Sequence, residues 1–133
     1  MIYVTDTHPL VFHLTGKPRK LGRRAASIFR DVDRGRAAIV IPITVLEEIM
    51  RLVEKDVVQL PRPFVPWVRE LSLSTNYRIQ PYTVDVLLEA AALPQIKDPC
   101  DRLVVATARL FDYPLITRDQ AIKDFNLIET IWN

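Results

Sequence analysis

The alternation of short β-branched segments with longer segments of helical periodicity is the feature that most constrains the fold of this chain. Residues 2–5 and 37–41 are typical of strands, and residues 78–80, 115–117 and 128–132 are weaker strand candidates. Helical segments that connect successive strands imply parallel pairing through right-handed crossovers, with helices on both faces of the sheet. The predicted fold class is therefore α/β, a three-layer α/β/α sandwich with a central parallel sheet.

The segments between these strands carry apolar side chains at helical spacing. Leu21, Ala25, Ile28, Phe29 and Val32 form one such stripe, and Gly35 follows it. The other expected helices cover residues 9–14, 67–71, 84–93, 98–111 and 119–125, together with a stripe that runs from Val45 to Val53. With 133 residues in all, the pattern predicts a single domain over residues 1–133.

Cysteine content and hydropathy predict a cytoplasmic protein. Cys100 is the only cysteine, so no internal disulfide can form, and a reducing cytosol is the expected setting. The N-terminus lacks the basic and apolar regions of a signal peptide, and no segment has the ~18 uninterrupted apolar residues of a membrane span. We therefore expect neither export nor membrane insertion.

Acidic residues occur at or just after the predicted strand-to-helix turns. They are Asp6, Glu47, Glu48, Asp98, Asp101 and Asp119. In open parallel sheets these turns meet at one edge, where ligands bind. Converging carboxylates require a cation or bound protons, and oxygen-only ligands favour Mg²⁺ or Mn²⁺ over zinc. Such ions can orient a water and stabilise the leaving oxygen in phosphodiester cleavage.

Each acid also has a local explanation in helix capping. Asp98 can cap the helix that begins at Pro99, and Asp101 can complement its dipole. A capping box from Thr44 to Glu47 would leave Glu48 without a local role. Thr117 as the cap of the last helix would likewise leave Asp119 free, and Asp6 can cap the first helix. Even if all these caps form, several turns still carry an acid that has no capping role.

Other catalytic arrangements fit the sequence less well. His8 and His13 lie five residues apart, which does not place them on one helical face, and no H-E-x-x-H motif is present. The sequence also lacks a G-x-S-x-G elbow, a Walker A loop and a G-x-G-x-x-G loop. Cys100 is expected to be a small buried core residue.

Basic residues concentrate between Lys17 and Arg36. Eight of them stand there against two acids, whereas the whole chain has a net charge of only +2. This segment, and Lys20, Arg23 and Arg24 in particular, could follow a phosphate backbone. The alternative interpretation is a helix face that merely contacts water.

Four segments resemble motifs of the PIN domains of VapC toxins. They are IYVTDTHPLVF, TVLEEIMRL, DPCDRLVVATA and LITRDQAI, and their order and spacing cover essentially the whole chain. In similar proteins four acids bind Mg²⁺ or Mn²⁺ for RNA cleavage, and the matching positions here are Asp6, Glu48, Asp101 and Asp119. Asp98 matches a further acid, and Thr117 and Thr7 match supporting polar positions. Two departures stand beside this set: Cys100 replaces a common phenylalanine, and Glu47 replaces a common tryptophan.

The resemblance implies a Mg²⁺- or Mn²⁺-dependent endoribonuclease that is the toxin of a type II toxin-antitoxin pair. It also implies an RNA substrate, a cognate VapB-like antitoxin over the acidic pocket, and a homodimer. The sequence leaves three alternatives open: a catalytically silent PIN scaffold that binds RNA or protein, a receiver-like Mg²⁺-binding signalling domain, and a phosphatase of the haloacid dehalogenase type. The last two lack parts of their motifs, since only Asp6 follows the first strand and His8 stands two residues later. A one-residue shift would make Glu47 the ligand instead of Glu48.

Overall fold

A five-stranded parallel sheet forms the centre of the molecule. The computed structural model describes all residues from 1 to 133. Its strands are β1 (Ile2–Thr5), β2 (Ala38–Pro42), β3 (Tyr77–Gln80), β4 (Leu115–Ile116) and β5 (Thr130–Ile131). They lie in the order β3-β2-β1-β4-β5, and every neighbouring pair is parallel. The predicted α/β class with a central parallel sheet is confirmed.

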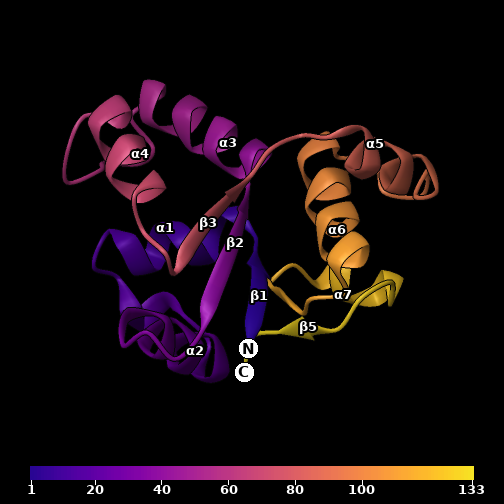
Figure 1. Cartoon of the computed structure of the whole chain (residues 1–133), viewed down its shortest axis with the longest axis horizontal. Coiled ribbons are helices and arrows are strands. Elements are labelled where there is room, and N and C mark those ends of the chain that lie inside the picture. Colours follow the sequence, from indigo (N-terminus) through magenta and orange to yellow (C-terminus); the bar gives the residue numbers. More distant parts are fainter.

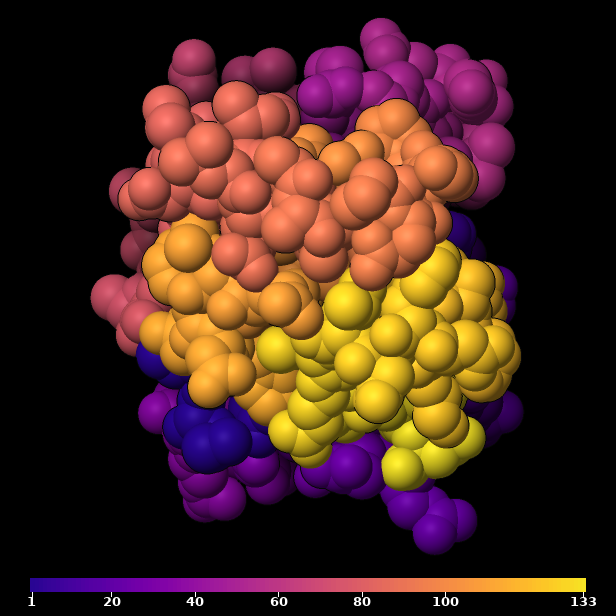
Figure 2. Space-filling model, turned by 90° about the vertical axis from the view of Figure 1, so that its right-hand side faces the viewer, coloured from indigo at the N-terminus to yellow at the C-terminus, as the bar shows by residue number.

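Two groups of helices flank this sheet (Figure 1). The first group is α1 (Thr7–Leu14), the 3₁₀ turn η1 (Pro18–Lys20), α2 (Arg23–Asp33), α3 (Ile43–Glu54) and α4 (Phe64–Ser72). The second group is α5 (Val84–Ala91), α6 (Pro99–Phe111) and α7 (Gln120–Phe125). Figure 2 shows the second side of the molecule, where the segment of α5 (salmon) lies above the C-terminal segment (yellow) and much of the segment of α6 (orange) lies beside it. None of the helices has both the length and the apolar character needed to cross a membrane.

The core forms where the helices pack on the sheet. All five residues of β2 are buried, as expected for a central strand that is covered on both faces. The predicted stripe on α2 is also confirmed, because Ala25, Ile28, Phe29 and Val32 all point into the core. These buried faces hold the strands in place, and with them the turns that follow the carboxyl ends of the strands.

Several element boundaries differ from the prediction. Helix α1 begins at Thr7 because the Asp6 side chain caps it, so it covers two residues more than expected. Helix α2 begins only at Arg23, after an unpredicted 3₁₀ turn, and Leu21 precedes it. The backbone N–H of Ala25 donates to the Trp132 carbonyl oxygen at 3.1 Å, so the C-terminal segment is tied to the start of this helix.

The strand order reverses between β1 and β4. From β1 the chain moves outward to β2 and β3, and it then crosses through α5 and α6 to β4 on the other side of β1. After β1 and β4 the chain therefore runs to opposite sides of the sheet. Such a place is a topological switch point, where open α/β sheets bind their ligands. Asp6 follows β1, and Thr117 and Asp119 follow β4.

Candidate functional site

Asp6 occupies the centre of the switch point. Its side chain is only 8% exposed, and both carboxylate oxygens accept hydrogen bonds: Oδ1 from the Thr7 backbone N–H at 2.9 Å and Oδ2 from the Thr117 hydroxyl at 2.7 Å. Burial raises the pKa of Asp6, the two hydrogen bonds partly offset this shift, and the charge of Glu48 adds to it. The carboxylate is therefore held in one orientation at an energetic cost that a nearby cation would reduce.

Thr117 and Asp119 form a turn that meets Asp6. The prediction that Thr117 caps the last helix is wrong, since Asp119 is the cap and its Oδ1 accepts the Ile122 N–H at 3.1 Å. The Thr117 hydroxyl instead donates to Asp6 and accepts the Asp119 N–H at 3.0 Å. It joins two turns that lie far apart in the sequence. Asp119 is therefore not free of a capping role, although its Oδ2 atom makes no hydrogen bond.

The start of α6 brings two further acids to the same edge. Asp98 caps the helix as predicted, and its Oδ1 accepts the Asp101 N–H at 2.9 Å. Burial raises the pKa of Asp101 to about 7, and the charges of four other acids, Asp6, Asp98, Asp119 and Glu48, add to the shift in that order. Five carboxylates that approach from four segments of the chain thus act on one another electrostatically.

Helix α3 contributes Glu48 to this group, whereas Glu47, which borders the same cavity as Glu48 and Asp98, is paired with Arg51. The predicted capping box is wrong, because α3 follows directly on Pro42 at Ile43 without a side-chain cap, and Thr44 lies within the first turn. Glu47 forms an exposed ion pair with Arg51, one helical turn further on. Glu48 is partly buried, and its charge contributes to the raised pKa values of Asp6 and Asp101.

Cys100 lies beside the acids without being a nucleophile. Burial, followed by the charge of Glu48, raises the pKa of its thiol to about 12, so the thiol stays protonated at neutral pH. The side chain is buried in the core cluster, and Sγ lies 3.9 Å from the Thr44 carbonyl oxygen. The prediction of a small buried core residue is confirmed.

A divalent cation suits the donors of this edge, although the side chains are not yet arranged around an ion. No set of three or more His, Cys, Asp or Glu side chains is positioned to hold one metal ion. Two observations favour a hard cation nevertheless. The donors are carboxylates, and their charges add to the burial that raises the pKa of Asp101; in addition, the fully buried hydroxyl of Thr7 has no hydrogen-bond partner. Binding would require the carboxylates to turn toward a common point.

The predicted basic residues separate in the structure. Lys20 borders a cavity of about 440 Å³ beside α1, whereas Arg24 borders a second cavity of about 320 Å³ beside Asp119. Arg23 is exposed on α2 and borders neither. Arg118 borders both cavities and was missed from the sequence, although its position between Thr117 and Asp119 was a usable signal.

Comparison with known proteins gives one consistent family. The family model described as PIN domain matches residues 3–127. The chain is 28% identical over 120 residues to Ribonuclease VapC22 of Mycobacterium tuberculosis, an alignment that covers 89% of this chain and 87% of that protein. The receiver and phosphatase alternatives do not agree with this match.

Solved structures agree at the level of the fold. The crystal structure of VapBC2 from Rickettsia felis bound to a promoter DNA fragment contains a chain with a TM-score of 0.72 and 16% identity, and both chains are covered completely. A toxin-antitoxin complex from Klebsiella pneumoniae gives a TM-score of 0.57 with 23% identity, over 89% of this chain and 87% of that one. Together with the family model, which spans nearly the whole sequence, these findings show that the chain belongs to the PIN-domain family.

Proposed function

We propose that this chain is a Mg²⁺- or Mn²⁺-dependent endoribonuclease and the toxin of a VapBC-type toxin-antitoxin pair. One observation carries the proposal: carboxylates from four segments lie close enough together at the switch point that the charges of four of them add to the effect of burial, and together these raise the pKa of Asp101 to about 7. The similarity to Ribonuclease VapC22 supports RNA as the substrate. Residues 1–133 act as one unit in this proposal.

The proposed metal ligands are Asp6, Glu48, Asp101 and Asp119, with Asp98 as a further acid at the same edge. The ion supplies an activated water and neutralises charge on the leaving oxygen of the phosphodiester. Glu48 is favoured over Glu47 because Glu47 is paired with Arg51, whereas Glu48 acts electrostatically on Asp6 and Asp101.

The remaining polar residues hold these acids in place. Thr117 donates to Asp6 and accepts from the Asp119 backbone, so it fixes the distance between the turns after β1 and β4. The Thr7 hydroxyl is buried beside Asp6 and Cys100 without a hydrogen-bond partner, and it would support the acids if a metal ion were bound. Lys20 and Arg24 border the two neighbouring cavities and hold the RNA backbone, which would make binding salt-dependent.

The proposed partners are a cognate VapB-like antitoxin and a second copy of the chain. Homologous chains occur in toxin-antitoxin complexes. Helix α5 also exposes apolar side chains that an interface could cover, since Val84, Leu87 and Leu88 are 70%, 49% and 62% exposed. Light scattering of the isolated chain tests the second copy, and light scattering after co-expression with a small open reading frame found directly upstream of its gene tests the antitoxin.

An RNA-cleavage assay with Mg²⁺, and with EDTA in its place, tests the catalytic assignment. Asp6→Asn and Asp119→Asn should abolish cleavage, whereas Glu129→Gln, which changes an exposed acid without a side-chain contact, should leave it intact. Circular dichroism establishes that each variant folds. Cleavage that continues in the folded Asn variants, or in EDTA, would come from a contaminating nuclease and would overturn the assignment.

The alternative of a catalytically silent PIN scaffold keeps one observation in its favour, since the acids are not yet arranged around an ion. Isothermal titration with Mg²⁺ and Mn²⁺ separates the two possibilities. A nuclease should bind the ion with an affinity that falls in Asp101→Asn. A chain that binds RNA but takes up neither ion would be the scaffold.

A further inference from the structure

A cavity beside α1 lies next to the acids but is lined by none of them. It has a volume of about 440 Å³ and opens between α1, η1, the end of α3 and the turn after β4. Its position relative to the acids follows from the chain: His8 stands two residues after Asp6, and Arg118 stands directly before Asp119. The cavity therefore adjoins the cluster of five acids, on the side of Asp6 and Asp119.

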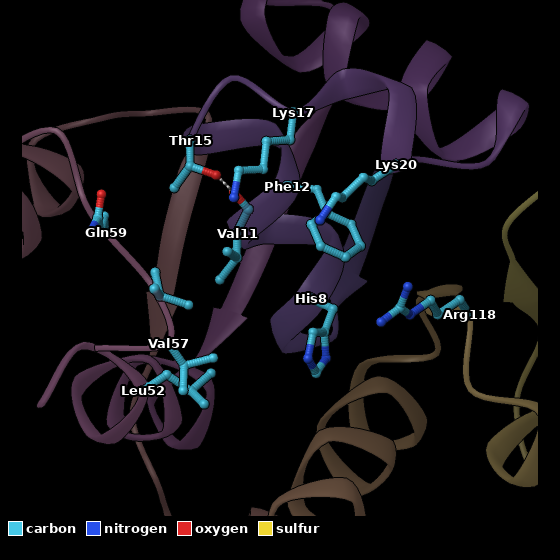
Figure 3. Close-up of a pocket in the computed structure, with 11 residues that line it drawn as sticks. His8, Val11, Phe12, Thr15, Lys17, Lys20, Leu52, Val57, Gln59 and Arg118 are labelled. Atoms are coloured by element: carbon cyan, nitrogen blue, oxygen red, sulfur yellow. Dashed lines mark hydrogen bonds between the residues drawn. The ribbon is translucent and has the colours of Figure 1, made fainter. Parts of the chain in front are cut away.

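One side of the cavity is cationic. Lys17, Lys20 and Arg118 border it, and none of the three forms an ion pair with an acid. The Lys20 ammonium lies 5.5 Å from the centre of the Phe12 ring, and the Arg118 guanidinium lies 5.0 Å from it. Figure 3 shows both side chains directed toward this ring. The aromatic ring thus holds two positive charges in place without neutralising them.

The other side of the cavity is apolar. Val11, Leu52 and Val57 border it, and Val57 is 67% exposed at its edge. His8 is exposed, and in Figure 3 its ring lies between this wall and Arg118. The Thr15 hydroxyl, which also borders the cavity, donates to the Val11 carbonyl oxygen at 2.6 Å. Cations on one side and aliphatic side chains on the other match an anionic ligand that has a flat apolar part.

We propose that this cavity binds one unpaired nucleotide of the RNA substrate, adjacent to the phosphodiester at the acidic group. The proposal rests on the proposed function and assigns a substrate subsite to it. The base lies against Val11, Leu52 and His8, and its phosphate lies between Lys20 and Arg118. The volume falls in the range of small-ligand sites, about 300 to 1,000 Å³.

Charge favours RNA over a protein ligand at this position. The neighbouring edge carries five carboxylates, so an approaching strand needs positive charge close by before a metal ion neutralises that edge. Lys20 and Arg118 over the Phe12 ring, with Lys17 at the same cavity, provide it over a short distance. An acidic and apolar peptide is the competing ligand, and the experiment below separates it from RNA.

Fluorescence anisotropy of a labelled single-stranded RNA, measured in EDTA so that no strand is cut, tests the subsite. Lys20→Glu should weaken binding about tenfold and flatten its salt dependence by about 0.7 in the log–log slope, which corresponds to one lost phosphate contact. Val57→Trp should fill the cavity and weaken binding about fivefold without altering that slope. The matched control is Arg36→Glu, the same charge change at an exposed position before β2, at the opposite edge of the sheet. It should change the affinity less than twofold.

A competition measurement tests the place of the base. Adenosine 5′-monophosphate should displace the labelled RNA better than ribose 5-phosphate, and Val57→Trp should remove that difference. Equal competition by the two compounds, or equal effects of Lys20→Glu and Arg36→Glu, would overturn the subsite. An unchanged RNA affinity in Val57→Trp would also overturn it and would leave the cavity to a protein ligand. If the wild-type chain still cleaves RNA with Mg²⁺ in that case, the subsite fails alone; if it neither binds nor cleaves RNA, the proposed function fails with it.

Discussion

Asp101→Asn should stabilise the metal-free protein, because it removes a carboxylate whose ionised form is disfavoured by burial and by the charges of four neighbouring acids. The pKa of Asp101 is about 7 in the folded chain, against 3.8 for an unperturbed aspartate, which is a rise of about three pK units. Each unit corresponds to ~1.4 kcal/mol, so full ionisation costs the folded state at most ~4 kcal/mol. The side chain is only partly buried, and solvent screening reduces this to about 2 kcal/mol at pH 8.

The pH dependence follows from the sign of the shift. Because the pKa is raised in the folded state, the folded chain binds more protons than the unfolded chain between pH 3.8 and about 7. Stability from this group is therefore fully present below pH 3.8 and is lost as the pH rises through that window. Asparagine carries no charge at any pH. The increase in the free energy of unfolding that Asp101→Asn produces at pH 5 should therefore be about two-fifths of the increase at pH 8.

Urea unfolding in EDTA at pH 8 and pH 5 measures this gain. At pH 8 the melting temperature of Asp101→Asn should also exceed that of the wild type by about 6 to 10 °C. Glu129→Gln, an exposed acid without a side-chain contact, should show no gain at either pH. A variant that is less stable than the wild type at pH 8, or whose gain does not depend on pH, would refute the electrostatic coupling of the acids.

Three further predictions concern metal binding and backbone contacts. Excess Mg²⁺ at pH 8 should raise the melting temperature of the wild type but not that of Asp101→Asn, since the ion binds the ionised acids of the folded state; calorimetry with equal shifts in both would contradict this. Thr117→Val should cost about 1–3 kcal/mol in urea unfolding because Asp6 Oδ2 and the Asp119 N–H lose their partner, whereas Thr117→Ser should cost less. Gly22→Ala should cost at least about 2 kcal/mol, because an added Cβ would collide with the Trp132 carbonyl oxygen, and an unchanged melting temperature would show that the C-terminal segment is not tied there.

Local patterns in the sequence were sufficient to predict the central elements. Residues 37–41 are a continuous apolar run that can only be buried on both sides, and the structure places β2 there at Ala38–Pro42. The Asp-Pro start at residue 98 carries a cap and an N1 proline, and α6 begins at Pro99. In both segments the determining interactions lie within a few residues, so the chain itself contains the information.

Helix caps were predicted only in part. Asp6 and Asp98 cap the helices that follow them, as their positions in the sequence indicate. Thr117 has a similar local pattern, yet the Asp119 side chain caps α7. The Thr117 hydroxyl accepts the Asp119 N–H and donates to Asp6, which lies 111 residues away in the sequence. No sequence motif contains that contact with a distant carboxylate.

The cavity beside the acids was not predictable from the sequence. Its cations come from the turn after α1, from η1 and from the turn after β4, and its apolar side chains come from α1 and from the end of α3. Lys20 was singled out for its charge, but its contact with Phe12 depends on how η1 folds back over α1. The second cation over the same ring, Arg118, arrives only through the pairing of β4 with β1.

The amino-acid sequence by itself determined the order of strands and helices, their parallel arrangement and the placing of an acid at each turn, because these depend on periodicity and on neighbours a few residues away. Only the tertiary structure decided which acids face one another, which are engaged by hydrogen bonds, and where unpaired cations border a cavity. Those properties arise from burial and electrostatics between segments that meet after the chain has folded, and both act through distances in space that no spacing along the sequence contains.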